Sequence, residues 1–286
     1  MNMKHYDFAF SCGFSCGVTQ ALRAADLQFA SFPFDWTASQ GFRACAQMIS
    51  DDFAHWMDRD DLVLVDVRRG GINKHIYRNR RNGFGFVHDF SSFKTFDENY
   101  PKESAKYVRR IERLKECLGA AKKVLAICVE WPILPRVSDE ELAETKRILS
   151  AKYPSVDFDL LYFYNENDRR EPKTVSERDG ITVVANDYRT FQYGEVNHEM
   201  DNRGLISYLK ENVSVEDPRT PDEKARYAAD WKKQDHARWH GKNWLETFVN
   251  RTRFRSYRRL EKFLVKKGLV PRERPLWCLA PGHPFV

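Results

Sequence analysis

Residues 124–129 read Val-Leu-Ala-Ile-Cys-Val, an unbroken apolar run with the length and composition of a strand buried on both faces. Ser138 and Glu141 follow at the spacing of a capping box, which predicts a helix beginning there. Two further strands are predicted at residues 158–164 and 181–185. Strands that alternate with helices in this way favour βαβ units, right-handed connections and an α/β fold with a mostly parallel sheet flanked by helices.

The N-terminal segment predicts a strand, a loop and a helix. Residues 6–10 have strand character, and residues 11–17 contain two glycines and two serines. The next apolar residues recur at the spacing of one helix face, and they are Val18, Ala21, Leu22 and Ala25. Cys16 therefore falls in the first turn of the predicted helix.

A proline turn at residues 32–36 separates this segment from the next predicted elements. These are a helical stretch at residues 42–57, a buried strand at 62–67, a strand at 83–90 and a helix after Pro101. The strand at 83–90 contains glycines, which indicate close approach of another backbone, and His88 lies at or near its end.

The position of Cys16 suits thiolate chemistry. A helix N-terminus lowers the pKa of a cysteine because its unpaired N–H groups and its dipole favour negative charge. Gly13 and Gly17 would let a substrate carbonyl approach the backbone, and N–H groups around Gly13, Ser15 and Gly17 could form an oxyanion hole. A cysteine after a glycine loop can equally be a packed small hydrophobe. A catalytic thiol needs a base, and the chain has eight histidines.

Three motifs in the first ninety residues resemble those of a known family. They are Ser11-Cys12-Gly13-Phe14-Ser15-Cys16, Pro33-Phe34-Asp35-Trp36 and Phe86-Val87-His88-Asp89-Phe90. The chain is similar to a bacterial domain-of-unknown-function family described as papain-like cysteine peptidases, whose members share a Ser-Leu-Gly-x-x-Cys start, a Pro-Phe-Asp-Trp turn and a His-Asp-Phe segment. The resemblance leaves open a papain-like α+β arrangement of the N-terminal part.

By position, the resemblance makes Cys16 the nucleophile and His88 its base. Asp35 is the preferred third member, which would orient the imidazole, and Asp89 is the alternative, although on an extended segment it would point away from His88. Asp35 can also simply close the turn and cap the following helix. Cys12 stands where the family has leucine, and it could form a redox pair with Cys16 or merely pack.

A papain-like site implies amide, ester or acyl chemistry, either hydrolysis or acyl transfer, on a small, peptide or glycan-linked substrate and without a cofactor. The alternative is a glycan-related transferase or a nucleotide-sugar-binding α/β protein without cysteine catalysis. The strand, glycine loop and helix at the N-terminus favour this alternative. Against it, Gly13 and Gly17 match neither a Gly-x-Gly-x-x-Gly motif nor a Walker loop.

The positive charge is concentrated at the C-terminus. From Arg219 onward there are seventeen Lys and Arg against seven Asp and Glu, a balance of +10, so the net charge of +6 leaves −4 for residues 1–218. We therefore predict an α/β domain at residues 1–218 and a basic amphipathic helical extension at 219–286, whose first helix begins at Thr220. The extension suits an anionic membrane or a phosphorylated glycan, with nucleic acid the less favoured partner. A noncatalytic protein that works through this extension is a third possibility.

The cysteines and the apolar segments indicate the compartment. The chain has six cysteines, at positions 12, 16, 45, 117, 128 and 278. They show neither the density nor the even spacing of a disulfide scaffold, which favours reduced thiols. No signal peptide or transmembrane segment is predicted, so we expect a cytoplasmic protein that the basic extension could hold at a membrane surface. His236 and His240 are four residues apart, but no third ligand accompanies them and no metal site is predicted.

Overall fold

The computed structural model describes residues 3–14, 16–68, 74–192, 195–227 and 229 of the 286-residue chain. The fold is mixed α/β with parallel and antiparallel strands. The chain divides into two compact units, each assembled from separate segments. The first unit is Met1–Asp61, Asn79–Gly85 and Ser104–Pro218, and the second is Leu62–Arg78, Phe86–Glu103 and Arg219–Val286.

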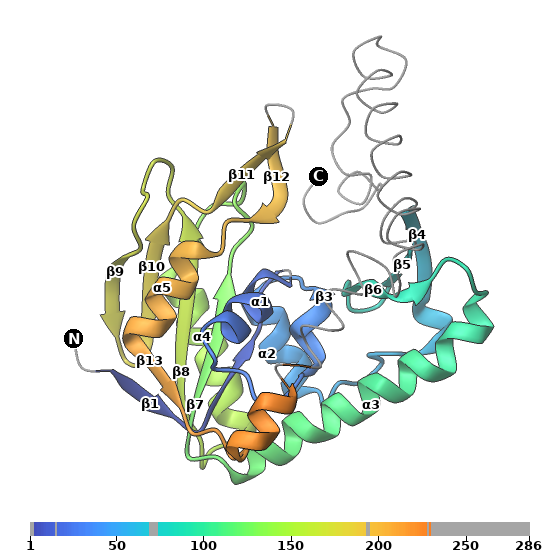
Figure 1. Cartoon of the computed structure of the whole chain (residues 1–286), viewed down its shortest axis with the longest axis horizontal. Coiled ribbons are helices and arrows are strands. Elements are labelled where there is room, and N and C mark those ends of the chain that lie inside the picture. The colour runs from blue at the N-terminus through green and yellow to red at the C-terminus, as the bar shows by residue number, and fades with distance from the viewer. Residues whose placement is uncertain (1–2, 15, 69–73, 193–194, 228, 230–286) are drawn as a thin grey trace. The chain divides into compact units, whose positions relative to one another are not determined.

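The main sheet of the first unit has five strands in the order β2-β7-β8-β10-β9. Figure 1 labels four of them, β7, β8, β10 and β9. The strands β2, β7, β8 and β10 run parallel, and β9 is antiparallel to β10. The strands predicted at residues 124–129, 158–164 and 181–185 are confirmed as β7, β8 and β10. The bounds are β2 (Phe8–Ser11), β7 (Lys123–Val129), β8 (Asp157–Asn165), β9 (Lys173–Arg178) and β10 (Ile181–Asn186).

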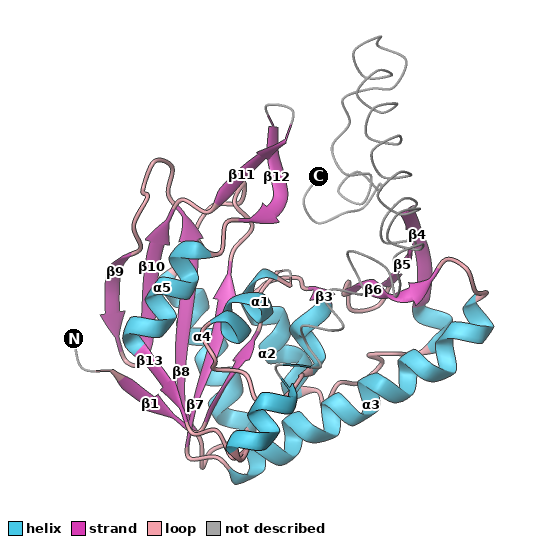
Figure 2. Cartoon of the chain, in the orientation of Figure 1, coloured by secondary structure: helices cyan, strands magenta, loops and turns pink. Residues whose placement is uncertain are grey.

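Helices cover this sheet because both sets of alternating side chains are apolar and buried. The predicted helix after Cys16 is confirmed as α1 (Gly17–Ala24). It packs beside α5 (Arg203–Asn212), and in Figure 2 both helices lie over the same face of the main sheet. The helix predicted at Ser138 is α4 (Asp139–Lys152), and the Glu141 N–H donates to the Ser138 hydroxyl at 3.2 Å. This helix packs on β8 and against α2 (Phe42–Ser50).

The strand predicted at residues 6–10 is two strands, β1 (Lys4–Tyr6) and β2, separated by Asp7. The Asp7 carboxylate accepts hydrogen bonds from the Lys122 and Lys123 N–H groups at 2.5 and 2.9 Å, and this turns the chain between the strands. As a result β1 leaves the main sheet and pairs in parallel with a distant strand. The remaining short elements of the first unit are β3 (Thr37–Ala38), β11 (Arg189–Gln192), β12 (Glu195–Met200), β13 (Val213–Val215) and the 3₁₀ helices η1 (Pro33–Trp36) and η2 (Arg59–Asp61).

Three neighbouring strands lie largely in the second unit, in the order β6-β5-β4. The strand predicted as buried at residues 62–67 does form, but the prediction of burial is wrong, because Leu64 is 50% exposed on a strand at the end of this order. Aromatic rings of Tyr77, Phe90 and Phe96 pack together beside it, with centroids 4.5 to 5.7 Å apart. The bounds are β4 (Leu62–Arg68), β5 (Lys74–Asn79) and β6 (Gly85–Ser91).

Two helix boundaries differ from the prediction. The helix expected after Pro101 is α3 (Phe96–Ala120), which begins earlier because Thr95 and Glu98 form a capping box: each side chain accepts the other's backbone N–H, at 3.3 and 2.7 Å. The helix predicted at 42–57 ends at Ser50, since positive φ angles at Asp52 and Phe53, 54° and 60°, turn the chain out of the helix.

The helix predicted to begin at Thr220 is confirmed. Residues 221–227 are helical, and Thr220 and Glu223 exchange the two hydrogen bonds of a capping box, at 2.8 and 3.3 Å. Most of the predicted basic extension, with His236 and His240, lies outside the described residues. Among the residues that are described, no helix combines the length and the apolar character needed to cross a membrane.

Candidate active site

Cys16 is the residue that immediately precedes α1 in the first unit. Its backbone is helical, with φ −62° and ψ −7°, and its carbonyl accepts the Gln20 N–H at 3.0 Å. The residue is partly exposed, and its sulfur lies 3.9 Å from the amide nitrogen of the Gln20 side chain, one helical turn further on. A thiolate at this point would be stabilised by the helix N-terminus and by the Gln20 amide.

The loop before Cys16 is held by specific contacts. Cys12 donates its N–H to the Ile127 carbonyl at 2.7 Å, so the loop is anchored beside the carboxyl end of β7. The Gly13 N–H donates to the Ser11 hydroxyl at 3.2 Å, and this bond occupies one of the groups predicted for an oxyanion hole. A side chain at position 13 would collide with the Val18 side chain, so packing against α1 requires glycine there.

Of the other predicted oxyanion residues, Gly17 is the first residue of α1 and is buried, and Ser15 lies outside the described residues. Phe14 is buried and its ring packs against Trp131, with centroids 4.0 Å apart. In this loop Phe14 is therefore buried, whereas Cys16 is partly exposed to solvent.

Cys12 differs from Cys16 in its exposure to solvent. It is 0% exposed, and its carbonyl accepts hydrogen bonds from Cys45 Sγ at 3.6 Å and from the Ser39 hydroxyl at 3.5 Å. Burial raises the pKa of the Cys12 thiol well above its usual value, and it does the same for Cys128. Cys12 is therefore a packed core residue in this structure, and it is a free thiol.

Asp35 lies in η1 and is 0% exposed. One carboxylate oxygen accepts from the Thr19 hydroxyl at 3.2 Å, and the other accepts from the Gln28 amide and from the Phe32 N–H, both at 2.7 Å. Burial raises the pKa of the Asp35 carboxyl, although these donors and the charges of Arg110 and Arg23 oppose that shift. The side chain thus ties α1, the following loop and the turn together.

His88 and Asp89 are consecutive residues of β6. The prediction placed His88 at or near the end of its strand, whereas it is the fourth of seven residues. His88 is half-buried and Asp89 is 6% exposed, and because the segment is extended their side chains leave opposite faces of the strand. Both residues belong to the second unit, and Cys16 and Asp35 belong to the first.

Two polar residues near the loop were not predicted. Gln20 could have been found as the residue one helical turn after Cys16. Glu130 directly follows β7 and is 6% exposed; its carboxylate accepts from the Trp131 N–H at 2.9 Å and from the Tyr162 hydroxyl at 3.2 Å, and burial raises its pKa. An acidic residue directly after a buried parallel strand is a recognisable signal, because ligands bind at the carboxyl ends of such strands.

One cluster in the described part of the chain has the composition of a metal site. Ligand atoms of His55, Asp58 and Asp61 lie within 4.8 Å of one another. However, Arg80 and Arg81 donate to the two Asp61 oxygens at 3.1 and 2.9 Å. Two guanidinium groups therefore occupy the carboxylate that a cation would need, and the cluster is an ion-pair network.

The comparison with protein families agrees with the motifs. The family model described as "Putative papain-like cysteine peptidase" matches residues 7–166, more than half of the chain. The chain belongs to this family. The matched region contains Cys16, Asp35, His88 and Asp89, and it extends through β7 and β8. No curated protein and no solved structure matches the chain.

Proposed function

We propose that the protein is a cysteine-dependent hydrolase or acyltransferase in which Cys16 is the nucleophile and His88 is the base. The observation that carries this proposal is the contrast between the two loop cysteines. Cys16 is partly exposed at a helix N-terminus, and Cys12, four residues earlier, is sealed in the core. Membership of the papain-like family supports the same assignment.

The proposed reaction begins when His88 takes the thiol proton and Cys16 Sγ attacks the carbonyl carbon of an amide, ester or other acyl compound. The carbonyl oxygen becomes an oxyanion, and in this proposal N–H groups at the start of α1 stabilise it. Collapse of this intermediate breaks the bond to the leaving group, which receives the proton from His88. Water, or an acceptor amine or alcohol, then attacks the thioester and releases the thiol.

The third member of the site is Asp35 or Asp89. Asp35 already accepts three hydrogen bonds, which supports a role in holding the turn. Asp89 is adjacent to the base, but its side chain leaves the other face of the strand. Replacing each by asparagine separates the two, because loss of the orienting carboxylate should lower the reactivity of Cys16 toward iodoacetamide near neutral pH.

The same labelling tests the main assignment. We expect iodoacetamide to modify Cys16 fastest among the cysteines, as measured by peptide mass spectrometry over time, and a His88→Ala variant to slow that step. His75→Ala is the matched control, because His75 lies on the neighbouring strand β5. Labelling of Cys16 that is no faster than labelling of Cys12, or that His75→Ala slows as much as His88→Ala, would refute the assignment.

Substrate and location are also part of the proposal. The +10 charge of residues 219–286 supports contact with an anionic surface, and a peptide or glycan-linked acyl group is the substrate that we favour. Co-sedimentation with anionic lipid vesicles should weaken as salt concentration rises. Tight binding of a nucleotide sugar that survives Cys16→Ala would instead favour the glycan-related transferase.

A further inference from the structure

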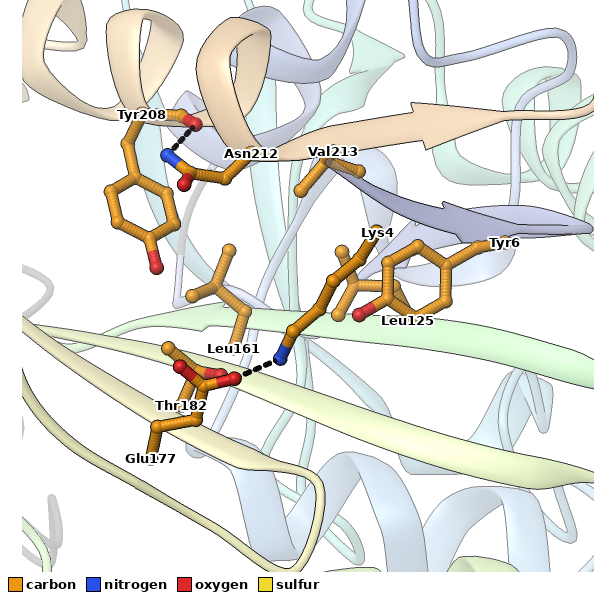
Figure 3. A pocket seen from close by; sticks show the side chains of 9 residues that line it. All are labelled: Lys4, Tyr6, Leu125, Leu161, Glu177, Thr182, Tyr208, Asn212 and Val213. Atoms are coloured by element: carbon orange, nitrogen blue, oxygen red, sulfur yellow. Dashed lines mark hydrogen bonds and ion pairs between the residues drawn. The ribbon is translucent and has the colours of Figure 1, made fainter. Parts of the chain in front are cut away.

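The first unit contains a small pocket over the amino-terminal halves of the central strands (Figure 3). Its volume is about 200 Å³. The lining comes from segments that are far apart in the sequence: β1, β9, the strands of the main sheet, and the end of α5 with β13. Cys16 follows the carboxyl end of β2, at the other end of the parallel strands, so this pocket is distinct from the candidate active site.

The interior of the pocket is apolar. Leu125 and Leu161 project from β7 and β8, and Val213 closes the side next to β1. All three are almost fully buried, with exposed fractions of 3%, 2% and 6%. The volume exceeds the roughly 150 Å³ of a cavity that holds benzene, so the pocket has room for a small branched side chain with a polar group attached.

Two opposite charges stand at the edge of this apolar space. Lys4 Nζ and a Glu177 carboxylate oxygen are 2.5 Å apart, and Figure 3 shows this ion pair beside Leu161 and Thr182. Their side chains are 36% and 46% exposed, and ion pairs that are this open to solvent contribute little to stability. A ligand can therefore open the pair without unfolding the strands that carry it.

Further polar groups of the lining are already engaged or point inward. The Tyr208 hydroxyl lies 3.2 Å from the Thr174 hydroxyl, and the Asn212 amide donates to the Tyr208 carbonyl at 2.9 Å. Thr182 is 7% exposed, and no group in the described part of the chain hydrogen-bonds its hydroxyl. A ligand thus meets hydroxyl groups, one cation and one anion around an apolar floor.

From this arrangement we infer that the pocket binds a small zwitterion with an apolar side chain, of the class of free aliphatic α-amino acids such as leucine. The ligand's carboxylate would pair with Lys4, its ammonium with Glu177, and its side chain would contact Leu125 and Leu161. A ligand that carries both charges replaces one ion pair by two, whereas a ligand with a single charge leaves Lys4 or Glu177 without a partner.

Calorimetric titration of the full chain tests this inference with L-leucine and three relatives. L-Leucinamide lacks the carboxylate, N-acetyl-L-leucine lacks the ammonium and glycine lacks the side chain. We expect leucine to bind with millimolar affinity or better and each relative to bind at least about tenfold more weakly. Leucinamide or N-acetyl-leucine binding as tightly as leucine, or a folded protein that shows no heat with leucine, would overturn the inference.

Variants assign the two charges to their partners. Lys4→Met should lower the affinity for leucine about tenfold and should not lower that for leucinamide, which no longer leaves Lys4 without a partner. Glu177→Gln should likewise lower the affinity for leucine about tenfold and should not lower that for N-acetyl-leucine. Lys210→Met is the matched control, because Lys210 is an exposed lysine of α5 outside the lining. Thr182→Leu fills the space and should abolish binding while circular dichroism shows a folded chain. Equal effects of Lys4→Met and Lys210→Met would contradict the site.

Discussion

The helix start at Cys16 and the turn at Asp35 both lie in the region that the family model matches, yet their surroundings are opposite. Cys16 is partly exposed at the end of a glycine loop. Asp35 is 0% exposed and satisfied by a hydroxyl, an amide and a backbone N–H. Solvent access and hydrogen bonding therefore separate the two regions. The Cys16 thiol is open to a substrate, whereas the Asp35 carboxylate is used to hold the turn.

The largest effect is expected at the first region. Cys16→Ser should lower kcat/KM for an activated ester such as p-nitrophenyl acetate at least about 10³-fold, because a hydroxyl in place of the thiol is a much weaker nucleophile. Cys12→Ser should leave the rate within about threefold, since Cys12 is sealed from solvent, and should lower the free energy of unfolding by about 1–3 kcal/mol through the buried hydroxyl. Loss of activity in Cys12→Ser alone would reverse the roles of the two cysteines.

The second region should respond through stability. Asp35→Ala leaves the Gln28 and Phe32 donors without their acceptor, whereas the Thr19 hydroxyl keeps its bond to the Asp35 carbonyl at 2.8 Å. We therefore expect a loss of about 3–5 kcal/mol in the free energy of unfolding, measured by urea titration. Asp35→Asn keeps one carbonyl acceptor and should cost less. If Asp35→Asn instead lowers activity with little change in stability, Asp35 belongs to the reacting site and the distinction between the two regions fails.

Much of the fold follows from local sequence. The apolar run at residues 124–129 predicted the strand β7, which is buried on both faces. The capping residues Ser138 and Thr220 predicted the starts of two helices. These features depend only on neighbouring residues, which is why they are readable. The pairing of β1 with β13 joins residues about 200 positions apart, and no local pattern encodes it. The exposure of Leu64 could not be predicted from local sequence either, because it depends on which strand lies at the end of a sheet.

The candidate site was predictable in part. The residue order of the motifs indicated Cys16 and the turn, because a helix start and a proline turn are local features. That Cys12 is sealed and that Asp35 meets Gln28 could not be predicted, because both depend on side chains brought together by tertiary packing. The contact of Gln20 with the sulfur follows from helix geometry and was accessible to sequence reasoning.

A smaller effect is expected from the loop that separates the two cysteines. Gly13→Ala places a methyl group against the Val18 side chain, whose Cβ would lie 3.1 Å away, and should destabilise the protein by about 1–3 kcal/mol. The second change Val18→Ala should recover part of this loss, which a double-mutant cycle measures. Gly119→Ala is the matched control, because nothing lies within 4 Å of its added methyl and alanine favours the helix. Destabilisation by Gly119→Ala of the same size would show that the loop is not specially packed.

The smallest effect concerns the pH dependence of stability at Asp35. Burial raises the pKa of this carboxyl, so between the ordinary value of about 4 and the folded value the native state holds more protons than the unfolded state. Stability contributed by this group is therefore complete below pH 4 and declines as pH rises through the folded pKa. Asp35→Asn removes that decline, and the stability difference between wild type and Asp35→Asn should be more favourable to wild type at pH 4 than at pH 7. Asp187 provides the opposite case, because Arg189 lowers the pKa of its carboxyl to about 2, and its stabilisation is lost as pH falls from 4 toward 2.

Urea titrations of the wild type, Asp35→Asn and Asp187→Asn should cover both pH ranges. The stability difference between wild type and variant should fall with rising pH for Asp35→Asn and rise with rising pH for Asp187→Asn. A profile of Asp35→Asn that runs parallel to wild type would mean that Asp35 is solvated in the native state, and the contrast with Cys16 would then lose its physical basis.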